Sequence, residues 1–220
     1  MAIREKLAKR AKRAGLNLPD SVISALETYF ELLKKWNQKV SLTALPIGSE
    51  GEEALDRLLI EPALASHYIA NPRATVIDVG SGGGSPAIPM KLVSPEIFMR
   101  MVESKARKAA FLREAVRQLN LTEAVVEASR LEELLIRPEL HEAADVITVR
   151  AVRAEKKLLA GIQAFLKPGG LLFLFRGGDT ATDSDLSSDF LRWEASHVLL
   201  PHLQSRLVIF RNVPRGTLTT

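Results

Sequence analysis

Apolar residues in the first third of the chain recur every three or four positions, which is the spacing of amphipathic helices. The longest such stripe comprises Val22, Leu26, Tyr29, Leu33, Trp36 and Val40. The pattern predicts helices over 1–14, from Pro19 to about 40, and from Glu52 to Tyr68, the last kinked or interrupted at Pro62. Because Trp36 lies within the apolar stripe, we expect a core residue there rather than a platform for base stacking.

From residue 74 the pattern changes to short apolar runs that alternate with helical segments. Strands are predicted over 75–79, 97–102, 123–127, 144–149 and 170–175. Helices are predicted over 86–93, 105–119, 131–136 and 153–166. This alternation indicates a parallel sheet covered by helices on both faces. Further strands near 192–200 and 206–213, joined by a short link, predict an antiparallel hairpin.

Five parallel strands followed by a hairpin form the layout of the Rossmann-like methyltransferases, an α/β fold with a mostly parallel seven-stranded sheet. We therefore expect two parts: a helical N-terminal extension over residues 1–70 and the α/β domain over 71–220. Asn71-Pro72-Arg73 is predicted to link them, and the segments 179–189 and 216–220 to lie outside regular elements.

Composition narrows the possible functions. The 220 residues are 46% hydrophobic and 25% charged, a balance typical of soluble globular proteins. The chain contains no cysteine, which excludes disulfides, thiolate metal sites and a cysteine nucleophile. The four histidines have no metal-ligand spacing, so no metal is expected. With no apolar run of about 20 residues and no apolar signal segment at its start, the sequence predicts a cytoplasmic protein without a membrane partner.

Basic residues are concentrated in residues 1–13 and 105–117, each of which holds a single acidic residue. Such clusters favour a polyanionic partner, nucleic acid above all, or else they are the solvated faces of ordinary helices. The residues predicted to contact RNA are Arg10, Arg13, Arg107 and Lys108, together with Arg150.

The strand at 75–79 runs directly into a glycine-rich turn with the pattern D-x-G-x-G-x-G, formed by Asp78, Gly80, Gly82 and Gly84. Glycine permits a tight turn whose backbone approaches a ligand closely. The dinucleotide pattern G-x-G-x-x-G would require glycine at position 85, where this chain has Ser85. The spacing therefore favours S-adenosylmethionine over NAD.

Further candidate residues follow the other strands, because ligands bind at the carboxyl ends of an open parallel sheet. Glu103 ends the second strand and is predicted to accept hydrogen bonds from a ribose; otherwise it is solvated or paired with Lys105 or Arg107. Leu131 and Glu132 follow the third strand, where Leu131 would flank an adenine. Arg150 ends the fourth strand, beside the expected point of methyl transfer.

Several motifs resemble those of the RsmG (GidB) family, bacterial S-adenosylmethionine-dependent methyltransferases of guanine N7 in 16S ribosomal RNA. The matching segments are Trp36-Asn37 with Leu42-Thr43, 78–84, Ile88-Pro89, Glu103-Ser104 with Arg107-Lys108, Phe111-Leu112-Arg113, 129–132, Arg150-Ala151 and Arg206-Leu207-Val208. The resemblance covers nearly the whole length. It implies that cofactor contacts fall at Gly80, Ser85, Leu131, Glu132 and Arg150.

The chain also departs from the family's pattern. The departures are Ser41 in N-L-T, Leu58 and Glu61 in R-H-x-x-D-S, Ser85 after the glycines, and Val149 in S-R-A. The cofactor positions mostly survive, whereas several positions expected to face the substrate do not. The resemblance therefore implies the cofactor more strongly than the modified guanosine.

The implied reaction needs few catalytic groups. Guanine N7 has an in-plane lone pair and no proton to lose, so no general base and no catalytic residue is assigned. Arg150 would orient the substrate or the cofactor carboxylate. The expected partner is 16S rRNA or the small ribosomal subunit, and a monomer is expected. The alternatives are a methyltransferase of a small molecule or protein, a non-catalytic RNA-binding relative and, last, a nicotinamide oxidoreductase.

Overall fold

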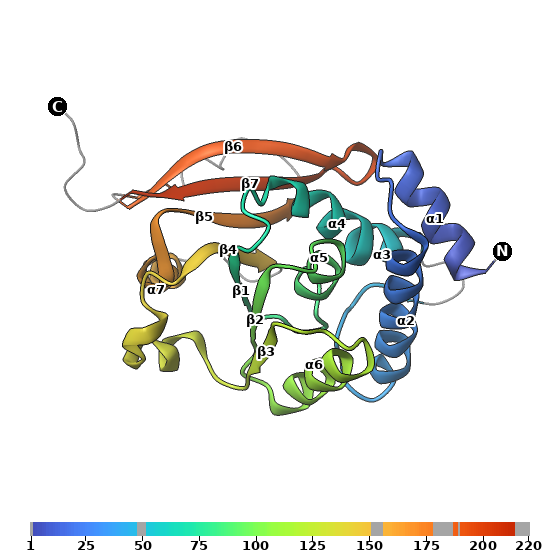
Figure 1. Ribbon diagram of the computed structural model, residues 1–220, viewed down its shortest axis with the longest axis horizontal. Helices are drawn as coiled ribbons and strands as arrows, with labels where there is room; N and C mark the ends of the chain where they lie inside the picture. The colour runs from blue at the N-terminus through green and yellow to red at the C-terminus, as the bar shows by residue number, and fades with distance from the viewer. Residues whose placement is uncertain (1, 48–51, 151–155, 178–186, 189, 214–220) are drawn as a thin grey trace.

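The protein is described by a computed structural model that covers residues 2–47, 52–150, 156–177, 187–188 and 190–213. Its centre is a seven-stranded sheet of order β3-β2-β1-β4-β5-β7-β6 (Figure 1). The strands are β1 (Thr75–Val79), β2 (Phe98–Val102), β3 (Ala124–Glu127), β4 (Ala144–Arg150), β5 (Leu166–Gly177), β6 (Leu191–Leu200) and β7 (Ser205–Asn212). The first five are parallel, and β7 pairs antiparallel with both β5 and β6. The predicted parallel sheet and terminal hairpin are confirmed.

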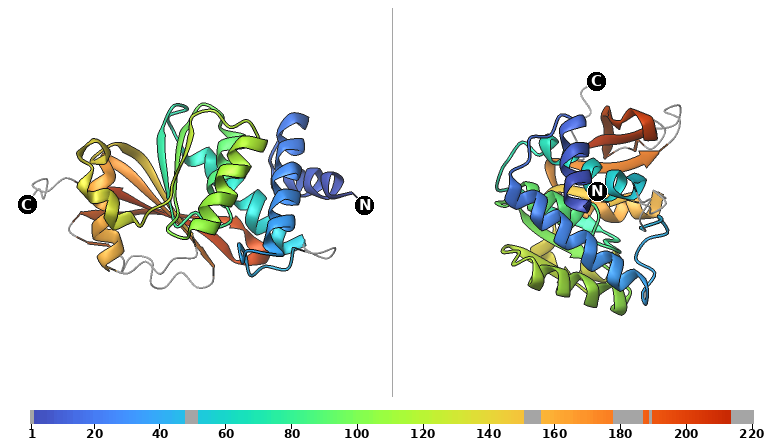
Figure 2. Two further views of the ribbon diagram at one scale, coloured as in Figure 1. Left: turned by 90° about the horizontal axis from the view of Figure 1, so that it is seen from below. Right: turned by 90° about the vertical axis from the view of Figure 1, so that its right-hand side faces the viewer.

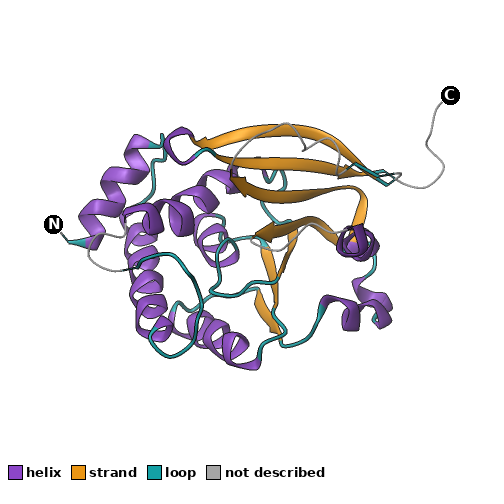
Figure 3. Ribbon diagram, turned by 180° about the vertical axis from the view of Figure 1, so that it is seen from behind, coloured by secondary structure: helices purple, strands orange, loops and turns teal. Residues whose placement is uncertain are grey.

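Helices cover both faces of this sheet, as the alternating pattern predicts. The regular α-helices are α1 (Ile3–Arg13), α2 (Asp20–Asn37), α5 (Ala87–Val93), α6 (Ala106–Gln118) and α7 (Lys156–Phe165). Most of them lie on one side of the strands (Figure 3), where α2 runs beside α6 (Figure 2, right) and also contacts α5. The other face is packed by α7 and the 3-10 helix η3 (Leu131–Ile136).

Three predicted helices differ from those in the structure. The segment from Glu52 to Tyr68 is divided into α3 (Glu52–Leu55), the π-helix η1 (Asp56–Ile60), α4 (Glu61–Ala65) and the 3-10 helix η2 (Ser66–Tyr68). The irregular π-helical turn thus precedes Pro62. This proline lies in the first turn of α4, a position that tolerates its lack of a backbone N–H. The predicted helix 131–136 is a 3-10 helix, followed by η4 (Pro138–Leu140).

The predicted helix 153–166 ends one residue earlier than expected, because Leu166 already belongs to β5. Residues 153–155 of that helix, most of 179–189 and the whole of 216–220 lie outside the described residues.

The N-terminal helices share one hydrophobic core with the sheet face that carries α5 and α6. Leu26 and Leu33 of α2 belong to the same buried cluster as Met99 of β2 and Phe111 of α6. Trp36 is partly buried and packs against this cluster, edge-on to Phe111 at 5.7 Å between ring centroids, so it lies at the border of the expected core. The division into residues 1–70 and 71–220 stays a prediction. None of the described helices is long and apolar enough to cross a membrane.

Candidate functional site

The glycine turn, residues 80–85, follows β1 at the carboxyl end of the sheet. The backbone N–H groups of Gly80 and Ser81 donate to the carbonyl oxygen of Val102 at 2.9 and 3.0 Å, which fixes the turn to the end of β2. Gly82 has φ +52°, in the left-handed region that favours glycine. The sequence therefore places its glycine where the backbone conformation requires one, and the exposed edge of the turn is free of side chains.

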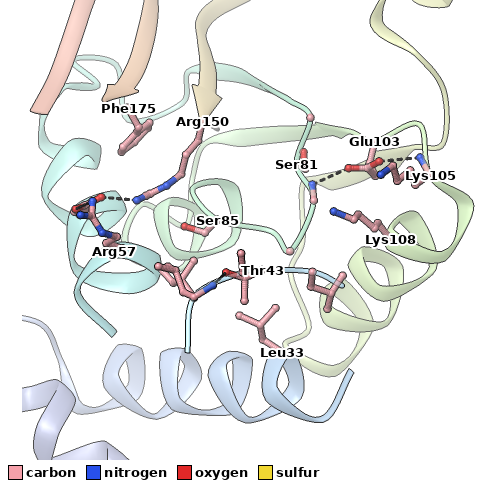
Figure 4. A pocket seen from close by; sticks show the side chains of 18 of the residues that line it. Leu33, Thr43, Arg57, Ser81, Ser85, Glu103, Lys105, Lys108, Arg150 and Phe175 are labelled. Atoms are coloured by element: carbon pink, nitrogen blue, oxygen red, sulfur yellow. Dashed lines mark hydrogen bonds and ion pairs between the residues drawn. The ribbon is translucent and has the colours of Figure 1, made fainter. Parts of the chain in front are cut away.

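A cavity of about 600 Å³ opens in front of the glycine turn. This volume is in the range of small-molecule sites. It is enclosed by the turn, the start of α6, the ends of β4 and β5, the residues 42–45 that follow α2, and one side of η1 and α4 (Figure 4). The N-terminal helical segment and the sheet thus both contribute walls to one site.

At one end of this cavity lies Glu103, whose side chain is largely buried. One carboxylate oxygen, Oε2, accepts the backbone N–H of Gly82 at 2.9 Å, and Oε1 accepts the N–H of Lys105 at 2.8 Å. Each carboxylate oxygen can accept a further hydrogen bond. The position therefore suits the predicted ribose contact, and the contact with Lys105 is a hydrogen bond to its backbone N–H rather than to its ammonium group.

At the opposite end Arg150, the last residue of β4, donates from Nη2 to Oε2 of Glu61 at 2.5 Å. Glu61 belongs to α4, and its side chain is only 2% exposed. The guanidinium also lies over the Phe175 ring at 5.3 Å from the centroid, a cation–π contact. Arg150 is thereby held between the sheet and the N-terminal helices, with its charge at the cavity wall (Figure 4).

The N-terminal wall is fixed by hydrogen bonds to the turn and within its own loop. The Tyr29 hydroxyl donates to the carbonyl oxygen of Gly83 at 2.5 Å, and burial raises the pKa of this tyrosine. Asn37 Oδ1 accepts the backbone N–H groups of Leu42 and Thr43 at 2.8 and 3.0 Å. These bonds position Leu42 and Thr43 against the cavity.

Behind the turn, Asp78 is 1% exposed. Its Oδ1 accepts the Thr148 hydroxyl at 2.5 Å, and its Oδ2 has no hydrogen-bond partner. Burial raises the pKa of Asp78 to about 6, although the Thr148 hydrogen bond acts in the opposite direction. Asp78 and Gly84 are not among the described residues that line the cavity, so they support the turn from behind.

Of the predicted cofactor residues, Gly80, Gly82, Ser85, Glu103 and Arg150 line this one cavity. Leu131 and Glu132 are not among the described lining residues: Leu131 is buried in the core on the α7 face, and Glu132 is exposed at the start of η3. An adenine contact there stays a prediction.

Among the basic residues predicted to contact RNA, some are accessible and one is bound to carboxylates of the protein itself. Lys108 lines the cavity, while Arg13 and Arg107 are exposed. Arg10 instead donates to Asp56 through Nε and Nη2 at 2.6 and 2.7 Å, and to Glu52 through Nη1 at 2.6 Å. These hydrogen bonds, with Asp56 first, raise the pKa of Arg10 and tie α1 to η1. The phosphate role fits Arg13 better than Arg10.

The sequence predicts no site role for Arg57 and Phe175, which both line the cavity, and it marks Glu61 only as a departure from the family pattern. Glu61 carried a signal that can be read without homologues: it is a lone acid within the apolar run 58–64, where an unpaired charge would be unfavourable. Phe175 gave no such signal, because it ends an entirely apolar strand segment.

Comparison with known proteins identifies a family over most of this fold. The family described as "GidB: rRNA small subunit methyltransferase G" matches residues 22–205. A ribosomal RNA small subunit methyltransferase G of Acetivibrio thermocellus is 32% identical over 180 residues, which cover 82% of this chain and 73% of the relative. The protein of the same name from Geobacter sp. strain M21 is 32% identical, covering 86% and 84%.

Solved structures support the fold alone, because their sequence identities are low. A mutant of the 16S rRNA (adenine(1408)-N(1))-methyltransferase from Catenulisporales acidiphilia superposes with a TM-score of 0.54 at 18% identity, covering 69% of this chain and 88% of that one. P. horikoshii TYW2 in complex with MeSAdo gives a TM-score of 0.53 at 11% identity, covering 70% and 62%.

Proposed function

The chain belongs to the GidB family, rRNA small subunit methyltransferase G, and on that premise we propose that it transfers a methyl group from S-adenosylmethionine to N7 of a guanosine in 16S rRNA. The observation that carries this proposal is the single cavity that joins the glycine turn and Glu103 to Arg150 and the N-terminal wall. One part of that cavity suits a nucleoside cofactor, and the rest leaves room for a base.

The residues present fit S-adenosylmethionine. The edge of the glycine turn at Gly82 carries no side chain, and a Cβ added there would lie 3.9 Å from Lys108 Nζ, on the cavity side of the turn. Glu103 can accept the ribose hydroxyls, and the buried Ser85 hydroxyl has no hydrogen-bond partner of its own. We infer that Gly80, Gly82, Ser85 and Glu103 hold the cofactor, with Leu131 and Glu132 near its adenine.

S-adenosylmethionine supplies an activated methyl group on a sulfonium. The chain's own residues need only hold the N7 lone pair in line with the methyl carbon and exclude water, since N7 has no proton to remove. Proximity and orientation of this kind can contribute roughly 7–11 kcal/mol. The shared walls of the cavity, formed by the sheet and by residues 42–45, are suited to that positioning.

The target guanosine must leave its helix to enter the cavity. The major groove of A-form RNA, which contains N7, is too deep and narrow for side chains, so we propose a loop or a flipped-out nucleotide as substrate. Arg13, Arg107 and Lys108 are proposed to bind flanking phosphates, with residues 1–70 on the substrate side. Affinity for 16S rRNA should then fall steeply between about 50 and 200 mM salt, and a flat dependence would contradict phosphate binding.

Incubation with labelled S-adenosylmethionine tests the function. The substrates are naked 16S rRNA, small ribosomal subunits from cells lacking this modification, and, as controls, 23S rRNA and a protein extract freed of RNA. We expect label in at least one of the first two and none in the controls. Label in the protein extract alone would favour the alternative of a protein methyltransferase. Light scattering during the same preparation tests the proposed monomer, which a dimer mass would contradict.

A further inference from the structure

Two polar atoms at the Glu61–Arg150 pair have no hydrogen-bond partner. Glu61 Oε2 accepts from Arg150 Nη2, but Glu61 Oε1 and Arg150 Nη1 are both buried without a hydrogen bond. Arg57 Nη1 lies 3.7 Å from Oε1, which is too long for a hydrogen bond. Buried polar groups are nearly always satisfied in native proteins, so an acceptor and a donor left over in one cavity wall point to a ligand.

One of the two atoms is an acceptor, on Glu61, and the other is a donor, on Arg150. Arg150 and Glu61 both line the cavity and are locked together by their ion pair, with Phe175 packed against the guanidinium. A guanine base has a matching edge: O6 accepts a hydrogen bond, and the adjoining N1–H and N2–H groups donate. Nη1 would donate to O6, and Oε1 would accept from N1–H and N2–H.

The order of the groups along this wall selects the base. Val149 pairs with Val79 in the sheet, so Arg150 lies at the level of the glycine turn, while Glu61 reaches Arg150 from α4. A purine whose N7 points to the methyl donor at the turn presents the group on C6 first and position 1 next. Adenine in this pose would place its amino group against the guanidinium and its bare N1 against the carboxylate, which is unfavourable at both points.

We propose that Glu61 and Arg150 together read the Watson–Crick edge of the target guanine, with Glu61 as a specificity-determining residue. This inference rests on the proposed function. It extends that function by assigning the choice of base to the carboxylate of Glu61, which comes from the N-terminal segment. At this position the chain departs from the family pattern. A buried pair of this kind discriminates strongly, because the wrong base leaves both partners without hydrogen bonds.

One other ligand has matching chemistry: the α-ammonium and α-carboxylate of the cofactor's methionine end would also fit an acceptor beside a donor. The two possibilities predict different losses. A guanine contact affects methyl transfer to RNA and leaves cofactor affinity unchanged, whereas a methionine contact weakens cofactor binding.

The test uses Glu61→Gln and Glu61→Asp in the full chain, with Glu53→Gln as the matched control. Glu53 also pairs with Arg57, but its side chain is 48% exposed and does not line the cavity. Calorimetry measures the Kd for S-adenosylmethionine, and label transfer measures kcat/KM for 16S rRNA. We expect Glu61→Gln to lower kcat/KM roughly 10- to 100-fold, with Glu61→Asp in between and the Kd within about threefold of the parent. Glu53→Gln should change neither.

A second substrate separates recognition of the base from a structural effect of the substitution. In this RNA the guanosine that the parent enzyme methylates is replaced by inosine, which lacks the N2 amino group. The ligated inosine RNA should lower kcat/KM about tenfold for the parent enzyme. It should leave Glu61→Gln nearly unchanged, because the glutamine oxygen would accept from Arg150 Nη2 and its NH2 group would replace the acceptor Oε1. If Glu61→Gln does not fold, as a thermal melt would reveal, the same comparison is made with Glu61→Asp.

Three outcomes would overturn the inference: equal inosine penalties in parent and variant, an unchanged kcat/KM in Glu61→Gln, or a Kd for the cofactor that weakens in step with kcat/KM. Absence of methylation by the parent enzyme would instead refute the proposed function, so the two failures are distinguishable.

Discussion

Asp78 should make the stability of this protein depend on pH in an unusual direction. Its carboxyl group is enclosed behind the glycine turn, and burial raises its pKa from 3.8 to about 6. The pKa of Asp78 is raised in the folded state, so folding favours the protonated acid. The contribution of Asp78 to the free energy of unfolding is therefore fully present below about pH 4 and is lost as pH rises through about 6. A shift of this size corresponds to about 3 kcal/mol.

Asp78→Asn removes the titration and keeps an oxygen that can accept the Thr148 hydroxyl. Urea unfolding of both proteins between about pH 4 and 7.5 should give nearly equal free energies at the acidic end. By about pH 7 the variant should gain up to about 3 kcal/mol relative to the parent. Asp20→Asn, which removes a highly exposed carboxylate, is the control and should show no such trend.

Thr148→Val provides a second check, since loss of its hydroxyl should raise the pKa of Asp78 further and move the transition to higher pH. The reasoning would be refuted if the free energies of unfolding of Asp78→Asn and the parent differed by the same amount at both ends of this pH range. The buried acid would then not titrate within the range.

Two further predictions concern the elements around the cavity. Gly84→Ala would place a Cβ 2.5 Å from Ile88 Cδ1 at φ +86°, so it should lower the free energy of unfolding by about 1–3 kcal/mol more than Gly15→Ala. Gly15 has φ +78° and open space around it. If urea titrations give both variants the same loss of unfolding free energy, the backbone angle alone determines the loss and the contact with Ile88 contributes nothing. Asp56→Ala should destabilise by about 3–5 kcal/mol, because Arg10 loses its buried partner and His202 its acceptor. Glu52→Ala removes only the exposed partner of the same arginine, and a loss as large as that of Asp56→Ala would contradict the importance of burial.

The fold could be predicted largely from local patterns. Five apolar runs separated by helical segments predict the parallel strands, and the short link before Ser205 predicts the hairpin. The errors lie where local pattern and tertiary packing differ. The six residues 131–136 are too few for their apolar spacing to distinguish a 3-10 helix from a short α-helix. Nothing in the residues around Asp56 indicates a π-helix.

The candidate site could be predicted only where its residues follow strands. Gly80, Glu103 and Arg150 do so, and all three line the cavity. The partners of charged residues could not be predicted, because they come from distant segments: Glu61 meets Arg150 across 89 positions, and Asp56 meets Arg10 across 46. A basic cluster in the sequence therefore identifies available charge but not which residues the protein uses internally.

Base and position of the methyl group are determined in one experiment. 16S rRNA labelled by this protein is treated with borohydride and aniline, which cleave at N7-methylguanosine, and the products are mapped by primer extension. We predict one dominant cleavage, at a guanosine in a loop or bulge, that disappears when S-adenosylmethionine is omitted. Label that resists cleavage, or label in adenosine after nuclease digestion, would contradict transfer to guanine N7.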